Sequence, residues 1–131
     1  MEDKHITPQI EEELHEIQQF LEDSPSSDVP DLLVDRLTML NAYMARTGFL
    51  LAEAKADQDN AIAAVFAEFK NLIIKMPATV ARTFIASQCE NENYYANWIE
   101  RINRACVHQS DNIRTQVSYA KENLKLTRSG Y

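Results

Sequence analysis

The sequence predicts an all-α protein: an elongated helical bundle of about four helices, one of them long and coiled-coil-like. Two observations support this fold class. Apolar residues recur every three or four positions along most of the chain, and no segment alternates as a strand would. Only two glycines occur, Gly48 and Gly130, whereas sheets joined by tight turns usually need more. A length of 131 residues suits a single helical domain.

The N-terminal segment 1–22 is expected to contain the first helix, over residues 8–22. Thr7 is a suitable N-cap, and Pro8 suits the first helical position because its missing N–H needs no partner there. The apolar face of this helix is expected to hold Ile10, Leu14, Ile17 and Leu21. The stretch "DSPSSDVP" follows, and its prolines, serines and aspartates predict a linker over residues 23–30.

The helical core, residues 31–126, is expected to begin with a long helix that ends near residue 75, before Pro77. Its apolar positions have the 3–4 spacing of a coiled-coil seam: Leu33, Leu37, Leu40, Met44, Thr47, Leu51, Ala54, Gln58, Ala61, Val65 and Leu72. The sequence leaves open whether the helix continues through residues 56–61. If unbroken, it is roughly 65–70 Å long. One chain cannot easily cover such a rod, so we expect a homodimer or higher homo-oligomer built around residues 33–72 and the last helix.

A short helix is expected at about 78–89, and the last helix from about 92 to 126, with a frayed tail at 127–131. At 100° per residue the last helix has two distinct faces. The core face holds Tyr95, Ile99, Ile102, Cys106, Gln109, Ile113, Val117, Ala120 and Leu124. The second face, about 100° away, holds Tyr94, Trp98, Arg101, Ala105, His108, Asn112, Thr115 and Tyr119.

The polar and aromatic residues of this second face admit two interpretations. In the first, the face packs on another helix or subunit and its polar groups find their partners there. In the second, Trp and Tyr rings stack a base while Arg and His hold phosphate, so the face is a ligand site. The candidate ligand-binding residues are Trp98, Arg101, Arg104, His108, Asn112 and Tyr119.

The sequence contains no recognisable catalytic, metal or cofactor motif, so we expect a protein that is not an enzyme. Glycine-rich phosphate loops are absent, and the three histidines lack metal-ligand spacing. Cys89 and Cys106 lie in helical patterns among apolar neighbours, which indicates reduced core cysteines and a cytoplasmic location. The longest apolar run, "AIAAVFA", is far shorter than the roughly 20 residues that span a bilayer, so no membrane partner is expected.

The charge is unevenly distributed along the chain. Residues 1–60 hold 14 acidic and 4 basic residues, whereas residues 61–131 hold 6 acidic and 9 basic residues. The acidic first half argues against bulk nucleic acid as a partner, because coating a phosphate backbone needs a positive surface. The basic second half is compatible with a small phosphate-containing ligand.

The pieces "MPATVARTF" and "ERINRACVHQSDNIRTQVSYAKE", within residues 76–124, resemble small all-helical accessory proteins encoded in phage and prophage genomes. The resemblance covers a little over a third of the chain. Some small helical phage proteins counter host defence, for example by sequestering cyclic nucleotide signals, and others accompany recombination genes. The resemblance implies no catalytic residue.

We therefore expect a non-enzymatic oligomeric binding protein that sequesters a phosphate-containing or nucleotide ligand. Two alternatives stay open from the sequence. One is a protein-interaction module that acts on a host or phage protein. The other is an accessory protein in single-stranded DNA handling or recombination.

Overall fold

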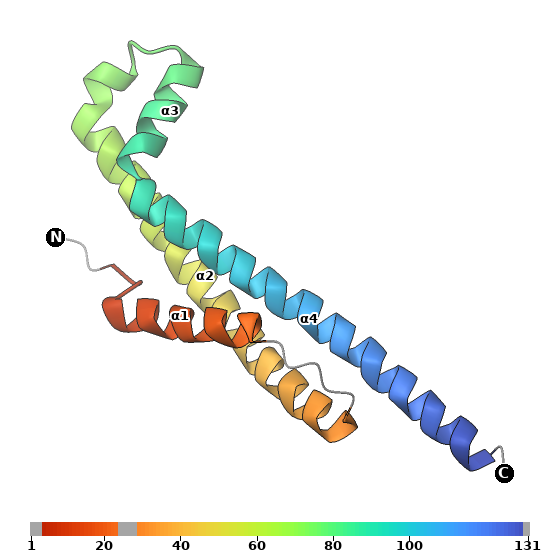
Figure 1. The fold of residues 1–131 in the computed structure, drawn as a ribbon. Coiled ribbons are helices and arrows are strands. Elements are labelled where there is room, and N and C mark those ends of the chain that lie inside the picture. Colours follow the sequence, from red (N-terminus) through yellow and green to blue (C-terminus); the bar gives the residue numbers. More distant parts are fainter. Residues whose placement is uncertain (1–3, 24–28, 130–131) are drawn as a thin grey trace.

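The computed structural model describes residues 4–23 and 29–129, and the regular structure within these ranges is entirely helical. The four helices are α1 (Pro8–Glu22), α2 (Pro30–Ile73), α3 (Ala78–Gln88) and α4 (Glu90–Ser129). The long helices α2 and α4 lie side by side and antiparallel, α1 packs against their middle, and α3 covers the far end of α2 (Figure 1). The predicted all-α bundle with one long helix is therefore confirmed.

Helix α1 has the bounds that the sequence predicts. The Thr7 hydroxyl accepts a hydrogen bond from the Ile10 amide at 3.3 Å, and this N-cap starts the helix. The apolar stripe Leu14, Ile17 and Leu21 is buried. The predicted linker falls mostly on residues 24–28, which lie outside the described residues, as do residues 1–3 and 130–131.

Helix α2 is continuous through residues 56–61, so the bend considered there does not occur. Asp57 is buried within this stretch, and the backbone amides of His5 and Ile6 donate to its carboxylate. The non-helical residue is instead Phe69 (φ −111°, ψ 21°), whose ring meets the Phe84 ring of α3 edge-on at 5.2 Å. The helix thus departs from regular geometry where α3 covers it, not where its sequence is most polar.

Most of the seam of α2 is covered by α4 of the same chain, although Leu72 at its end is 50% exposed. Leu40, Thr47 and Ala54 are at most 1% exposed, so this seam no longer supplies the reason for expecting a dimer. The buried face also drifts from the predicted spacing, since Leu50 is fully buried in place of Leu51. A straight helix has 3.6 residues per turn, so a strict 3.5-residue seam rotates away from its partner along the helix.

Helix α4 begins two residues earlier and ends three residues later than predicted. Ile99, Ile102 and Cys106 of its predicted core face are at most 1% exposed. The prediction is wrong at Leu124, which is 52% exposed because α2 begins at Pro30 and does not reach that far along α4 (Figure 1).

Both cysteines are buried and free, as predicted. Cys89 marks the break between α3 and α4, with backbone angles of φ −119° and ψ 31°. Within residues 4–23 and 29–129, no helix has the length and apolar content needed to cross a membrane.

Candidate functional site

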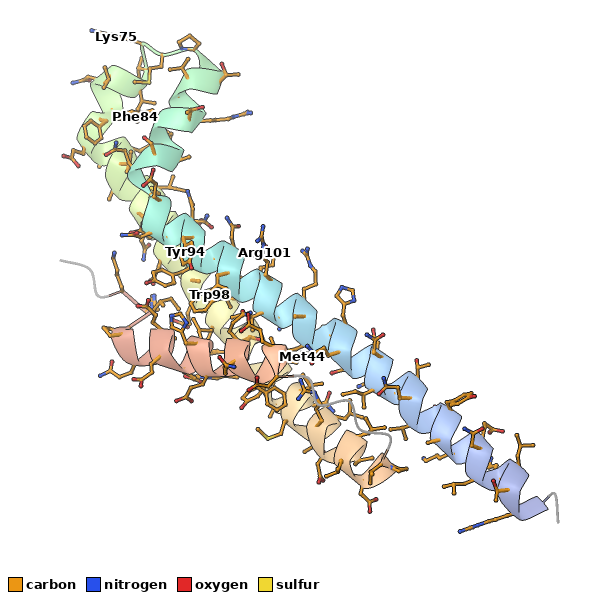
Figure 2. All side chains as sticks on the ribbon, viewed as in Figure 1. Met44, Lys75, Phe84, Tyr94, Trp98 and Arg101 are labelled. Atoms are coloured by element: carbon orange, nitrogen blue, oxygen red, sulfur yellow. The ribbon has the colours of Figure 1, made fainter. Side chains whose placement is uncertain are left out.

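A groove of about 620 Å³ lies between α1 and α4, and we call it the α1–α4 groove. Its lining includes the buried side chains of Leu21 and Ile102, and most of its other lining residues are polar or aromatic. The lining residues are His15, Gln18, Leu21, Glu22, Tyr94, Trp98, Arg101, Ile102, Ala105 and Gln109. Figure 2 labels three of them, Tyr94, Trp98 and Arg101, on successive turns of α4.

Trp98, the single tryptophan of the chain, is held in one orientation in this groove. Its indole N–H donates to Oε1 of Gln18 at 3.2 Å, and the His15 ring centroid lies 4.8 Å from its own. The Tyr94 ring centroid lies 6.1 Å from that of Trp98. The indole is half-buried, its N–H is satisfied, and its side chain lines the groove.

Arg101 is the cation of the groove. Within the described residues it makes no hydrogen bond or ion pair, and its side chain is exposed. Two other arginines are engaged: Arg104 pairs with Glu100 at 2.9 Å, and Arg46 donates twice to Glu13, at 2.6 and 2.9 Å. The Arg101 guanidinium presents its five donors to solvent beside the groove.

The side chains of Arg36 and Gln109 bond to each other and to the C-terminal end of α1. The Arg36 guanidinium donates to the carbonyls of Phe20 and Asp23 and to Oε1 of Gln109, at 2.9–3.0 Å. The Gln109 amide donates to the Leu21 carbonyl at 3.0 Å. These bonds satisfy carbonyls at the end of α1, so Gln109, the polar residue of the predicted core face, anchors α1 and is not a ligand contact.

The structure places the six predicted ligand-binding residues at different points along α4. Trp98 and Arg101 lie together in the α1–α4 groove. His108 and Asn112 are exposed further along the helix, and Arg104 is exposed and paired with Glu100.

Tyr119, the sixth residue, is 69% exposed and lines a second groove of about 680 Å³ with Pro30 and Leu33. Within one chain the structure thus brings together Trp98 and Arg101, and separates them from Tyr119. A cleft that unites all six residues across two copies stays a prediction.

The predicted set omitted His15 and Gln18, although both touch Trp98. They belong to α1, roughly 80 residues away in sequence, and no periodicity in either helix indicates that the two meet. Tyr94 carried a detectable signal, since it lies on the same stripe of α4 as Trp98.

A second polar cluster joins the N-terminal segment to α2 and is satisfied within the chain. Both Asp57 oxygens accept from the His5 amide at 3.0 Å, one also accepts from the Ile6 amide, and His5 Nδ1 lies 2.6 Å from Oδ1. Burial alone raises the pKa of Asp57, but these hydrogen bonds outweigh it and hold the pKa below its ordinary value. Across the described ranges, no group of three His, Cys, Asp or Glu side chains is placed to hold a metal ion.

No family model, no curated protein and no solved structure matches this chain.

Proposed function

We propose that this chain is a non-enzymatic binding protein that takes a phosphate-bearing aromatic ligand, such as a nucleotide, into the α1–α4 groove. The observation that carries this proposal is the unpaired guanidinium of Arg101 on the same groove as the fixed indole of Trp98. Guanidinium groups pair with phosphate oxygens in a planar fork, and indole rings stack on bases. A volume of about 620 Å³ is in the range of small-molecule sites.

The charges of the groove favour one orientation of such a ligand. Glu22, the carboxylate among the lining residues, stands at the C-terminal end of α1, and Arg101 supplies the positive charge. We therefore expect the phosphate at Arg101 and the base against Trp98. Stacking contributes about 1–3 kcal/mol and a charged hydrogen bond about 1.5–3 kcal/mol.

The emission of Trp98 tests the proposal directly, since no other tryptophan contributes. The protein is titrated with adenosine monophosphate, adenosine and inorganic phosphate. We expect the monophosphate to quench the emission most strongly, and Arg101→Ala to weaken its affinity by about tenfold to a hundredfold.

The matched control is Arg114→Ala, which removes an exposed arginine of the same helix that pairs with Asp111 outside the groove. Equal losses in the two variants would exclude a role for Arg101. An emission and a melting temperature that none of these compounds changes would overturn the proposal.

The exposed apolar residues near the turn between α2 and α3 favour a second candidate function, a protein-interaction module. Around the turn between α2 and α3, the exposed fractions of Leu72, Ile74 and Val80 are 50–70%, and exposed apolar patches are typical of interaction surfaces. Under this alternative, Ile74→Asp abolishes association with a host or phage protein while Arg101→Ala leaves it unchanged.

The third alternative, single-stranded DNA handling, predicts oligonucleotide binding that weakens steeply with salt, and an oligonucleotide in the titration panel tests it. A phage or prophage origin rests on the resemblance of residues 76–124 alone.

A further inference from the structure

The C-terminal part of α4, residues 114–129, which we call the tail, carries an apolar seam that is covered at its start, where Val117 packs against the core, and exposed at Leu124. Asn103 donates to the Met44 carbonyl and Gln109 accepts from Arg36, so residue numbers fall along α2 as they rise along α4. Because the two helices are antiparallel, the first residue of α2, Pro30, lies beside α4 before α4 has ended, and the rest of α4 extends beyond it (Figure 1). The core face nevertheless continues along the tail with Val117, Ala120, Leu124 and Thr127.

The uncovered seam lies beside an open groove. Leu124 is 52% exposed, and the second groove, of about 680 Å³, lies between this stretch of α4 and the residues Pro30 and Leu33 of α2. Side chains at 3–4 spacing beside an apolar groove are the arrangement that receives another helix. Around Leu124 the tail is therefore a helix face without a packing partner within the described chain.

The tail and the start of α2 carry opposite charge. The tail has a net charge of +3, from Arg114, Lys121, Lys125 and Arg128 against Glu122. The start of α2 exposes Val29, Leu32 and Val34 by about half, next to Asp31 and Asp35. Its own arginine, Arg36, is turned towards α1 and engaged there. One chain thus presents an apolar basic surface and an apolar acidic surface at the same end.

We propose that two copies of this chain associate through these ends, so that the tail of each lies along the start of α2 in the other. The contact is isologous: both copies use both surfaces, and the assembly closes as a dimer with two-fold symmetry. It covers the seam around Leu124 and one side of the start of α2, since Leu32 and Val34 lie about 160° apart around the helix. It also sets the basic tail against acidic Asp31 and Asp35, whereas two tails facing only each other would repel.

A second copy fits better than an unrelated acidic helix. A foreign helix on the seam would leave the start of α2 exposed, while a second copy supplies a cover for the seam and for one side of the start of α2. The inference uses no residue of the α1–α4 groove, so ligand binding there and this association can fail independently.

Light scattering on the purified chain tests the proposal. We expect a mass twice the 15.0 kDa of one chain at tens of micromolar protein, without growth at higher concentration. Leu124→Glu should give the monomer, because it places an unpaired charge in the seam. The matched control is Leu126→Glu, a residue 67% exposed and about 200° further round the helix, which should stay a dimer.

Charge reversal provides a second measurement with its own rescue. Lys121→Glu with Arg128→Glu should weaken the dimer at least tenfold, and so should Asp31→Lys with Asp35→Lys. Combining all four changes should restore dimerisation, because opposite charges face each other again. A monomeric parent, a parent mass that keeps growing with concentration, equal effects of Leu124→Glu and Leu126→Glu, or no rescue would each overturn the proposal.

Discussion

The middle of the molecule and the tail of α4 are equally regular helix, yet their polar side chains bond in different ways. In the middle, where α1 covers α2 and α4, bonds run between helices: Asn103 donates to the Met44 carbonyl at 2.9 Å and to the Thr47 hydroxyl at 3.0 Å. Between described residues, the bonds of the tail are local, as in the Arg114–Asp111 pair and the bond from the Thr127 hydroxyl to the Asn123 carbonyl.

This difference teaches what each kind of contact specifies. A local bond between residues three or four apart stabilises a helix but does not determine which other helix it packs against. A bond between residues more than fifty apart, such as that between Asn103 and Thr47, fixes one register between two helices. The middle is therefore a completed core, whereas Leu124 in the tail is 52% exposed and the Thr127–Asn123 bond beside it is local.

The largest expected effect is on the free energy of unfolding, and it follows from the difference in apolar burial between the middle and the tail. Ile99 is fully buried among residues of α1 and α2, so Ile99→Ala should lower the free energy of unfolding by about 2–5 kcal/mol. Leu126→Ala, in the tail, should change it by less than about 0.5 kcal/mol. Guanidinium unfolding followed by Trp98 emission measures both, and comparable losses would show that the tail belongs to the same core.

The helices themselves could be predicted because their signals are local. Thr7, Pro8 and Pro77 mark helix ends in the sequence, and the observed bounds differ from the predicted ones by three residues or fewer. Burial along the shared length of α4 was predictable for the same reason, since Ile99, Ile102 and Cys106 follow helical periodicity.

The sequence could not predict which helix covers a given apolar side chain or which group bonds to a given polar one, because both depend on contacts between distant segments. Leu124 has the same periodicity as Ile99, but its exposure is set by where α2 begins. Asp57 lies in residues 56–61, where the sequence leaves the continuity of the helix open. In the structure the amides of His5 and Ile6, some fifty residues away, stabilise its carboxylate in a buried position. The candidate site shows the same limit, since α4 indicated Trp98 and nothing in the sequence indicated its contact with Gln18.

A smaller effect tests the bonds between helices in the middle. Arg36→Met keeps an aliphatic stem next to the Phe20 ring but removes the donors to two carbonyls and to Gln109. We expect a loss of about 1–3 kcal/mol in the free energy of unfolding, since these acceptors lose their partner. Arg114→Met removes an exposed local pair and should cost under about 1 kcal/mol. If the two arginines cost the same, the contrast between the regions does not hold.

A smaller effect of opposite sign is expected at Ser110. Its hydroxyl is fully buried on α4 and has no hydrogen-bond partner within the described residues, unlike the bonded polar groups around it. Ser110→Ala removes that unsatisfied group at nearly constant volume and should raise the free energy of unfolding by up to about 1 kcal/mol. Thermal unfolding measures this gain, and a clear loss would mean that the hydroxyl has a partner in solution.

The smallest effect concerns pH and the segment that joins the N-terminus to the middle. The hydrogen bond with Asp57 raises the pKa of His5 despite some burial, and the neighbouring Glu53 adds to the rise. A raised pKa means that the folded chain favours protonated His5, so this contribution is present at low pH and is lost as pH rises through the raised value. The lowered pKa of Asp57 works in the opposite direction, because its contribution is lost as pH falls through that value.

The segment at His5 should therefore be held most firmly between the lowered pKa of Asp57 and the raised pKa of His5. We expect the melting temperature of the parent to decline slightly from about pH 6 to about pH 9, where histidine loses its proton. His5→Ala should remove most of that decline and keep the acid-side loss, because the amides of residues 5 and 6 still bond to Asp57. His15→Ala is the matched control, since His15 lies against Trp98 and not against a carboxylate. If parent and His5→Ala lose stability in parallel over this range, the ring of His5 does not help to hold the segment on α2.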